Sequence, residues 1–170
     1  YKGMKRIAII GGGAAGLAAA LSAGYNAAQR ARKVEIAVFE AADRIGKSSL
    51  ASGNGRCNFS NKNMDAEKYR SASVVDQAYQ YVPPFRVHEM FREIGLFTSE
   101  ESDGRLYPLT NKANTILDVL RFALKDFSID VVCNRKVHSV TPVDGSYLLA
   151  FDDDQTAFFD NEGNFIGYIV

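Results

Sequence analysis

The chain has 170 residues, of which 46% are hydrophobic and 24% charged, the composition of a soluble globular domain long enough to bury a proper core. Lys plus Arg and Asp plus Glu number 20 each, and this balance excludes a dominant electrostatic role at nucleic acid or at a membrane surface. The two cysteines form no CxxC and no metal-type cluster with the two histidines. They could form one disulfide, but a domain of this size does not need one, so we expect a reducing, cytoplasmic setting.

The opening segment, residues 5–40, has the pattern of a strand, a helix and a second strand. Lys5 to Ile10 reads as a short buried strand that ends at three glycines. Residues from Ala14 to about Arg32 are rich in alanine and predict a helix. KVEIAVFE at 33–40 is a second buried strand rich in β-branched residues. This strand–helix–strand order predicts an α/β fold with a central parallel sheet.

Residues 7–24 read IAIIGGGAAGLAAALSAG and carry no charge, over about the length that spans a bilayer core. Most of the run is Ala and Gly, which gain little in lipid, and three consecutive glycines weaken any helix there. The glycines also interrupt the apolar region that a secretory leader needs. We therefore expect neither a membrane span nor a leader.

The glycines of this run fit the pattern G-x-G-x-x-G at Gly11, Gly13 and Gly16. The first allows a sharp turn, the second a close approach of backbone to phosphates, and the third close packing of helix on sheet. A helix that starts at Ala14 and Ala15 offers free N–H groups and a positive dipole end to an anion. The segment predicts a dinucleotide site, against the alternative of a glycine-rich turn with no ligand.

Glu40 ends the second strand, where a carboxylate accepts hydrogen bonds from a ribose diol and repels a 2′-phosphate. It lies 24 residues after Gly16, more than the usual spacing of about 20. We expect the extra residues to extend the helix or the loop that follows it, around Arg30–Lys33.

The rest of the chain predicts a long loop followed by helices and by strands that end in a small antiparallel β-meander. The loop at 41–63 is rich in Ser, Gly and Asn, and loops of that length are usually functional or disordered. The elements expected after it are helices at 65–81 and 84–94 separated by Pro83–Pro84, strands within 96–109 turned at 102–104, a helix at 111–127, strands at 129–133, 137–143 and 147–151, the last two joined at 144–145, and a turn at 161–164 before a final strand.

The stretch SSLASGNGRCNFSN at 48–61 resembles a family of bacterial flavoproteins, labelled NAD(P)/FAD-dependent or aminoacetone-oxidase-like oxidoreductases. That family has a GGGxAG turn, a strand ending in an acid, GRK, SGxGRCNxTN and GRxFPxxxKAxxVxxxL. The matching strings are GGGAAG at 11–16, VFE at 38–40, IGKSS at 45–49, SGNGRCNFSN at 52–61 and DGRLYPLTNKANTILDVL at 103–120. The departures are Ser48 for a lysine, Tyr107 for phenylalanine, and the long first helix.

The resemblance implies a Rossmann-like FAD-binding domain over residues 1–170: a βαβ nucleotide unit at 5–40, a flavin-side loop at 41–63, and helices and strands at 64–170. It places the pyrophosphate at the Gly11–Gly16 turn and the adenosine ribose at Glu40 and Ala41, with backbone contacts from Val137 to adenine. On the flavin side it implies Lys47, Ser52, Gly53, Asn54, Arg56, Cys57 and Asn58.

The implied activity is that of a flavin-dependent oxidoreductase acting on a small-molecule substrate, by two-electron transfer through the flavin. NAD(P)H is a candidate electron donor. The residues alone also leave open an NAD-binding dehydrogenase domain and a non-catalytic nucleotide-binding module. They identify no catalytic acid–base pair, no metal site, no substrate and no oligomeric state.

In the resembled family the chain continues with a strand ending in a second glycine motif, ATGG, and with a substrate-side domain. Neither occurs in this sequence. We therefore expect residues 1–170 to be a truncated N-terminal portion that cannot turn over substrate alone.

Several chemistry-bearing residues also have structural interpretations. Arg56 is expected either to contact the cofactor or to pair with a carboxylate across the domain. A lone Cys57 is more often packed than redox-active. We expect His88 to be solvated on a charged helix, His138 to be non-catalytic on a strand, and the acidic run at 152–154 to form a solvated turn.

Overall fold

The computed structural model describes residues 5–47, 52–143, 146–152 and 156–159. The chain divides into two compact units. Unit 1 consists of residues 1–48 and 121–170, and unit 2 of residues 49–120. Unit 2 is therefore inserted into the sequence of unit 1, between its second and third parallel strands.

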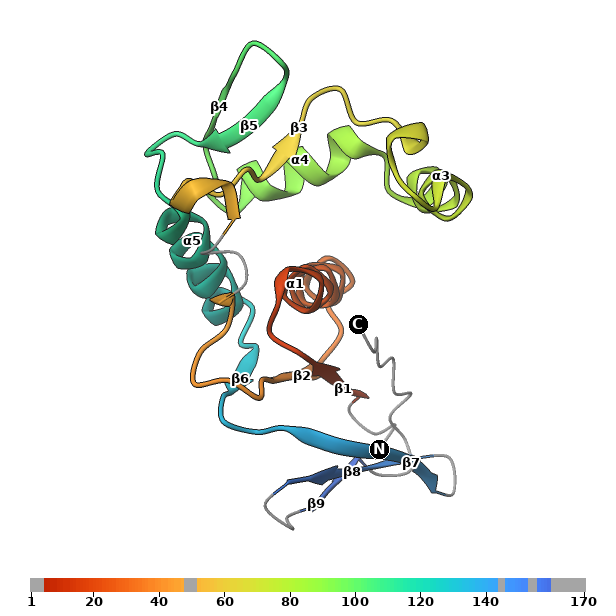
Figure 1. Ribbon diagram of the computed structural model, residues 1–170. Helices are drawn as coiled ribbons and strands as arrows, with labels where there is room; N and C mark the ends of the chain where they lie inside the picture. Colours follow the sequence, from red (N-terminus) through yellow and green to blue (C-terminus); the bar gives the residue numbers. More distant parts are fainter. Residues whose placement is uncertain (1–4, 48–51, 144–145, 153–155, 160–170) are drawn as a thin grey trace. The chain divides into compact units, whose positions relative to one another are not determined.

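The sheet of unit 1 is parallel, with the strand order β1-β2-β6 (Figure 1). Its strands are β1 (Lys5–Ile10), β2 (Val34–Phe39) and β6 (Asp130–Val132). Ile36, Val38 and Phe39 of β2 are buried, as expected for the central strand of a covered parallel sheet. The sheet confirms the predicted α/β class and the predicted strand–helix–strand opening.

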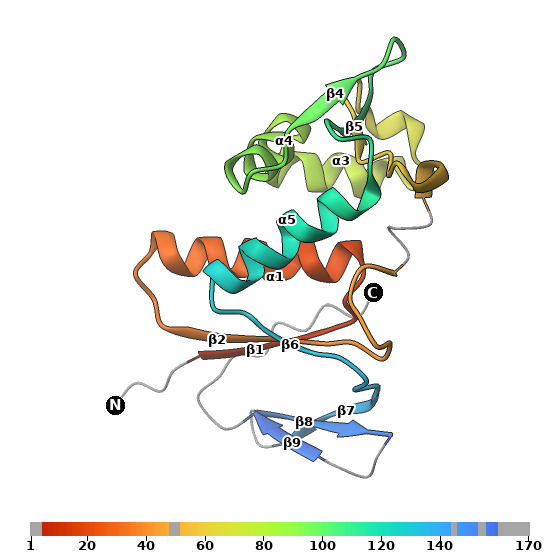
Figure 2. The same cartoon turned by 90° about the vertical axis from the view of Figure 1, so that its left-hand side faces the viewer.

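Helix α1 (Ala14–Gln29) covers one face of this sheet (Figure 2). Its buried stripe consists of Gly16, Leu17, Ala20, Leu21 and Gly24. A Cβ atom at Gly24 would lie 2.8 Å from Cβ of Phe127, so the small residue lets the two segments pack closely. No helix among the described residues is long and apolar enough to cross a membrane.

The predicted C-terminal end of α1 is wrong by three residues. The helix ends at Gln29, and Ala31 turns the chain with a left-handed φ of 48°. The four residues Arg30–Lys33 therefore belong to the connection that leads into β2. They account for part of the long spacing between Gly16 and Glu40.

An antiparallel sheet with the order β7-β8-β9 lies on the face of the parallel sheet opposite α1 (Figure 2). Its strands are β7 (Val137–Val143), β8 (Ser146–Phe151) and β9 (Thr156–Phe159). Ala8, Phe39, Leu149 and Phe151 form the buried cluster that joins the two sheets. The hairpin β7–β8 was predicted, whereas β9 was not. The final strand predicted after residue 164 lies outside the described residues.

Unit 2 contains a small antiparallel sheet of order β3-β5-β4 and several short helices (Figure 1). Its strands are β3 (Ser60–Asn61), β4 (Thr98–Glu100) and β5 (Arg105–Pro108). Its helices are the 3₁₀ turns η1 (Ser52–Gly55) and η2 (Ala66–Lys68), and the α-helices α3 (Ala72–Tyr81) and α4 (Pro84–Glu93).

Two predictions in unit 2 need correction. Residues 65–81 are not one helix, because η2 ends at Lys68 and α3 begins only at Ala72. The expected loop at 41–63 contains η1 and the two-residue strand β3. The predicted break at Pro83–Pro84 is confirmed, since Pro84 opens α4 at its first position.

Helix α5 (Ala113–Asp126) begins in unit 2 and ends in unit 1. The apolar side predicted for it is buried, at Ile116, Leu117, Leu120 and Leu124. The helix leads directly into β6, so it returns the chain to the parallel sheet.

Candidate functional site

The glycine turn after β1 is shaped first by Gly11. Its φ of +98° lies in the left-handed region that favours glycine, and its N–H donates to the carbonyl of Phe39 (2.8 Å). A Cβ at this position would meet nothing within 4 Å. Backbone conformation, rather than lack of space, therefore explains the first glycine of the motif.

Gly16 is required for a different reason. A Cβ atom there would lie 1.9 Å from the carbonyl oxygen of Gly11, and 3.4 Å from Cγ2 of Ile9. Gly16 therefore lets the first turn of α1 lie directly against the backbone of the glycine turn. The close packing of helix on sheet that the sequence predicted, here against Ile9, constrains this position less.

The N-terminus of α1 presents unpaired donors beside this turn. Gly13 precedes the helix in an extended conformation (φ −79°, ψ −176°) that any residue adopts. The first helical hydrogen bond runs from the N–H of Leu17 to the carbonyl of Gly13 (3.0 Å). The N–H groups of Ala14 and Ala15 therefore have no acceptor within the helix, and both residues are exposed.

Glu40 follows β2 and holds the glycine turn with its side chain. One carboxylate oxygen accepts from the N–H of Gly12 (2.6 Å), and the other from the N–H of Ala42 (2.7 Å). A carboxylate has about four acceptor positions, so two bonds leave room for hydroxyl donors. Glu40 is only half-buried, which keeps those positions accessible.

Gly12 is a residue of the site that sequence reasoning did not single out. A Cβ there would lie 2.5 Å from Cγ2 of Ile45 and 3.0 Å from the Glu40 carboxylate. The sequence did contain a signal for Gly12. Of the three consecutive glycines, the motif requires only Gly11 and Gly13, so a glycine between them indicates a further close contact.

Glu40, Ala41 and Val137 lie in one part of unit 1. The backbone N–H of Arg135 donates to the Glu40 carbonyl and that of Asn134 to the Ala42 carbonyl, both at 2.9 Å. These bonds bring the start of β7, and with it Val137, to the end of β2. The glycine turn and Glu40 both follow the carboxyl ends of parallel strands, the usual place for ligands in α/β sheets.

Lys47 also belongs to unit 1, close to its boundary. Its ammonium pairs with the carboxylate of Asp43 at 2.5 Å, on the exposed surface. The hydrogen bond from Lys47 lowers the pKa of Asp43 below its ordinary value. The structure therefore shows a local ion pair at the residue that the resemblance assigned to the flavin side.

The loop with Ser52, Gly53, Asn54, Arg56, Cys57 and Asn58 belongs to unit 2. Its backbone is tightly turned, with left-handed φ values at Asn54 (53°), Gly55 (79°) and Cys57 (58°). Non-glycine residues in this region cost roughly 1–2 kcal/mol each, so surrounding contacts must hold the turn. Cys57 is buried, and neither it nor Cys133 forms a disulfide.

Arg56 supplies contacts that hold this loop. Its guanidinium pairs with the Glu101 carboxylate, donates to Oδ1 of Asn111 (3.3 Å), and lies 4.0 Å above the Tyr107 ring. Of the two interpretations of Arg56, the structure shows the pairing with a carboxylate, which is that of Glu101. The guanidinium stacks as well as pairs, which a lysine could not reproduce.

The prediction that His88 is solvated needs correction, because the imidazole is not fully exposed. It is partly buried, with Nε2 2.7 Å from Oγ of Ser60, and burial lowers the pKa of His88 below its ordinary value. His138, in contrast, is exposed and lies 3.4 Å from Asp152, which also pairs with Lys136. Asp153 and Asp154 lie outside the described residues.

No cluster of three or more His, Cys, Asp or Glu side chains able to hold a metal occurs in the described part of the chain.

Comparisons with known proteins identify relatives of this chain. The family model described as the HI0933-like protein Rossmann domain matches residues 5–161. The 3-dehydro-bile acid delta(4,6)-reductase of Clostridium scindens is 34% identical over 142 residues, which cover 81% of this chain and 33% of that protein. This chain thus spans about a third of the length of the curated relative.

Two solved structures resemble the fold. The Diels-Alderase PyrE3 of pyrroindomycin biosynthesis matches with a TM-score of 0.51 at 15% identity, over 96% of this chain and 32% of its own. The THI4 protein of Thermovibrio ammonificans matches with a TM-score of 0.48 at 18% identity, over 87% of this chain and 48% of its own. At such identities the likeness to PyrE3 concerns the fold alone.

Proposed function

The chain belongs to the HI0933-like Rossmann-domain family, and from that premise we propose that it binds FAD as the cofactor-binding part of a flavin-dependent oxidoreductase. One observation carries the proposal. The open N-terminus of α1 and the Glu40 carboxylate are joined through the glycine turn, by the hydrogen bond from Gly12 to Glu40.

The residues present fit the AMP half of a dinucleotide. The exposed N–H groups of Ala14 and Ala15 suit pyrophosphate oxygens, and the helix dipole adds a favourable field. The remaining acceptor positions of Glu40 suit the two ribose hydroxyls. A carboxylate at this point repels a 2′-phosphate, which favours FAD or NAD over NADP as the resident cofactor.

FAD is favoured over NAD by the loop at residues 52–58, whose sequence resembles that of a flavoprotein family. FAD, when bound, supplies two-electron transfer through its isoalloxazine ring. The chain's own residues bind and orient it. Glu40 would accept hydrogen bonds from the ribose hydroxyls, and the N–H groups of Ala14 and Ala15 would donate to the pyrophosphate. Arg56 holds the tight turn at residues 54–57 through Glu101 and Tyr107.

The same proposal covers the reaction partners of the whole protein. A small-molecule substrate is reduced or oxidised at the flavin, with NAD(P)H as the electron donor for a reductase. The free thiols Cys57 and Cys133 support a reducing, cytoplasmic setting.

The test is a binding experiment on the purified chain. Any cofactor that co-purifies is released by denaturation and identified by mass and fluorescence, and the emptied chain is then titrated with FAD, FMN and NAD. We expect FAD to bind most tightly and ADP to compete with it, because the contacts described recognise the AMP half, which FMN lacks. Preference for NAD would support the dehydrogenase alternative, and equal binding of FMN and FAD would contradict the assignment of Glu40 and the glycine turn.

A further inference from the structure

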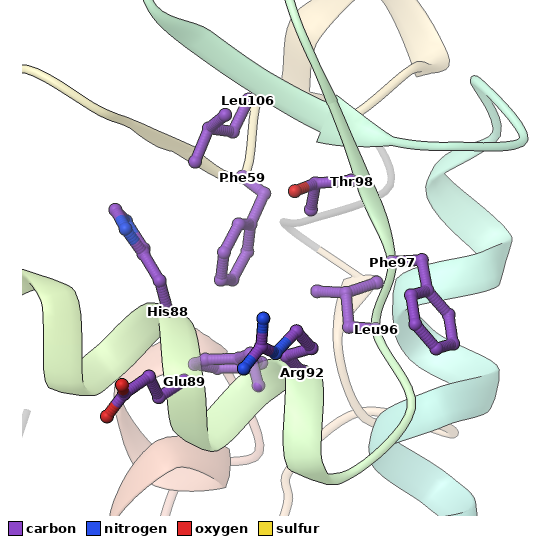
Figure 3. A pocket seen from close by; sticks show the side chains of 9 residues that line it. Phe59, His88, Glu89, Arg92, Leu96, Phe97, Thr98 and Leu106 are labelled. Carbon is purple, nitrogen blue, oxygen red and sulfur yellow. The ribbon is translucent and has the colours of Figure 1, made fainter.

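Unit 2 contains a cavity of about 240 Å³ between α4 and the small antiparallel sheet (Figure 3). We call it the α4 pocket. Its walls are mainly apolar, and its lining includes Phe59, His88, Phe91, Arg92, Leu96 and Leu106. All of these residues belong to unit 2, whereas the glycine turn and Glu40 belong to unit 1.

The aromatic walls of the α4 pocket are held in place by one another. The rings of Phe59 and Phe91 pack edge to face with centroids 4.6 Å apart, and the His88 ring lies 6.3 Å from Phe59. Nε2 of His88 lies 2.7 Å from Oγ of Ser60. Backbone pairing adds support, since the N–H of Phe59 donates to the carbonyl of Leu106 at 2.8 Å. The cavity thus has fixed walls.

Arg92 places an exposed guanidinium at the edge of the α4 pocket. Within the part of the chain that the structure describes, no carboxylate pairs with this guanidinium, and Arg92 is among the lining side chains labelled in Figure 3. Glu89 also borders the pocket, but its carboxylate points away from Arg92 (Figure 3) and pairs with Arg86 at 3.1 Å, a guanidinium that also lies 3.6 Å from Glu93. Burial lowers the pKa of His88, so the imidazole is neutral at pH 7 and adds no charge.

We propose that the α4 pocket binds a small aromatic carboxylate, whose ring packs against Phe59 and Leu106 and whose carboxylate pairs with Arg92. The size supports this class of ligand, because an apolar cavity of roughly 150 Å³ already holds benzene. The aromatic walls favour a ring in edge-to-face contact. The unpaired guanidinium favours a carboxylate, which it can bind through two parallel hydrogen bonds.

This site does not depend on FAD, so its test is a separate one. The purified chain is titrated with benzoate and with benzamide, which has the same shape but no charge, and binding is followed by calorimetry and by NMR shifts of unit 2. Benzoate is expected to bind saturably, and benzamide about tenfold more weakly, the usual effect of losing a charge-assisted hydrogen bond. Absence of saturable benzoate binding, or equal binding of both probes, would overturn the proposal.

Two variants and one control locate the site. Arg92→Gln should weaken benzoate about tenfold and leave benzamide unchanged. Thr98→Phe, an exposed strand position on the pocket wall, should fill the cavity and abolish the binding of both probes. Arg70→Gln removes an exposed arginine of unit 2 outside the pocket, so it should change neither. Circular dichroism establishes that each variant is folded, and benzoate binding that survives in both pocket variants would place the probe elsewhere and refute the assignment.

Discussion

The carboxylate of Glu40 accepts a hydrogen bond from the backbone N–H of Gly12 across 2.6 Å, which joins the end of β2 to the turn after β1. A second bond, from the N–H of Ala42, holds the other oxygen at 2.7 Å. Glu40 therefore supports the shape of the glycine turn before any ligand arrives. The residue proposed to bind the ribose also stabilises the fold, and its substitution should affect both properties.

Glu40→Gln is expected to lower both stability and FAD affinity. The amide has one oxygen to serve two backbone donors, and its NH₂ group then faces an N–H. Leaving one such donor unsatisfied costs about 1–3 kcal/mol of unfolding free energy, and the loss of ribose contacts adds a similar cost to FAD binding. Chemical denaturation and calorimetry measure the two effects.

Glu35→Gln is the matched control for Glu40. Glu35 lies on β2, the strand that Glu40 follows, but it is exposed, and its carboxylate pairs with Arg6 at 2.6 Å on the surface. Its cost should be no more than about 1 kcal/mol, with FAD binding unchanged. If both variants behave alike, the two backbone bonds of Glu40 contribute nothing specific.

Substitutions of Gly13 and Gly16 should have different effects, the first on FAD binding and the second on folding. Gly16→Ala places a Cβ 1.9 Å from the Gly11 carbonyl oxygen, so we expect the parallel sheet to be severely destabilised or not to form. Gly13→Val meets no backbone strain at φ −79°, and the domain should fold, but its branched side chain should block the phosphates and abolish FAD binding. Circular dichroism and FAD titration read out the two effects. Tight FAD binding by Gly13→Val would show that the phosphates lie elsewhere.

A double-mutant cycle should find a coupling between Arg56 and Glu101. Because both side chains are partly exposed, screening limits the expected coupling to about 1 kcal/mol. Arg56→Lys keeps the charge but loses the stacking on Tyr107, so its stability should fall between those of the wild type and Arg56→Gln.

The exposed pair of Lys62 and Glu100, 2.9 Å apart in the same unit, is the control cycle and should show almost no coupling. Equal couplings in the two cycles would mean that Arg56 acts only as a surface charge.

His88 should make the protein less stable in mild acid. Its pKa is lowered by burial in the folded chain, so between the ordinary value of 6.5 and the lower folded value the unfolded state binds more protons. Stability therefore falls as the pH drops through this window and is fully present above it. Denaturation at a series of pH values should show this loss, and NMR titration of the ring should give a midpoint below 6.5.

The two histidines allow an internal comparison. His88→Gln should flatten the pH dependence below 6.5, whereas His138→Gln, at an exposed position, should leave it in place. An unchanged pH profile in His88→Gln would assign the acid sensitivity to other groups.

The sequence predicted features that depend on local patterns. Residues 5–40 carry the strand, turn and helix signals in consecutive order, and the first and third glycines are explained by the turn that they form. Pro83–Pro84 separates two helices because proline cannot continue one. Glu40 was singled out because an acid at the end of the second strand can bind a ribose diol, and the structure shows its carboxylate hydrogen-bonded to the glycine turn.

Other features depend on contacts between distant residues and could not be read along the chain. Arg56 meets Glu101, and His88 meets Ser60, only through the folding of unit 2. Residues 65–81 look uniformly helical, yet Tyr69 adopts an extended conformation that separates η2 from α3. Strand β9 forms because β8 offers it a partner edge, with Tyr147 opposite Phe159.

The insertion of unit 2 has a consequence for how the molecule is made. Strand β2 pairs with β1 early in synthesis, but its other edge waits for β6, whose Asp130 pairs with Ala37. The entire insertion must emerge from the ribosome before that edge is covered, and such distant pairings form slowly. Until then the apolar strand VEIAVF presents an open template for other chains. Polypeptides that stop anywhere within unit 2 should therefore self-associate, and the complete parallel sheet protects the protein against its own aggregation.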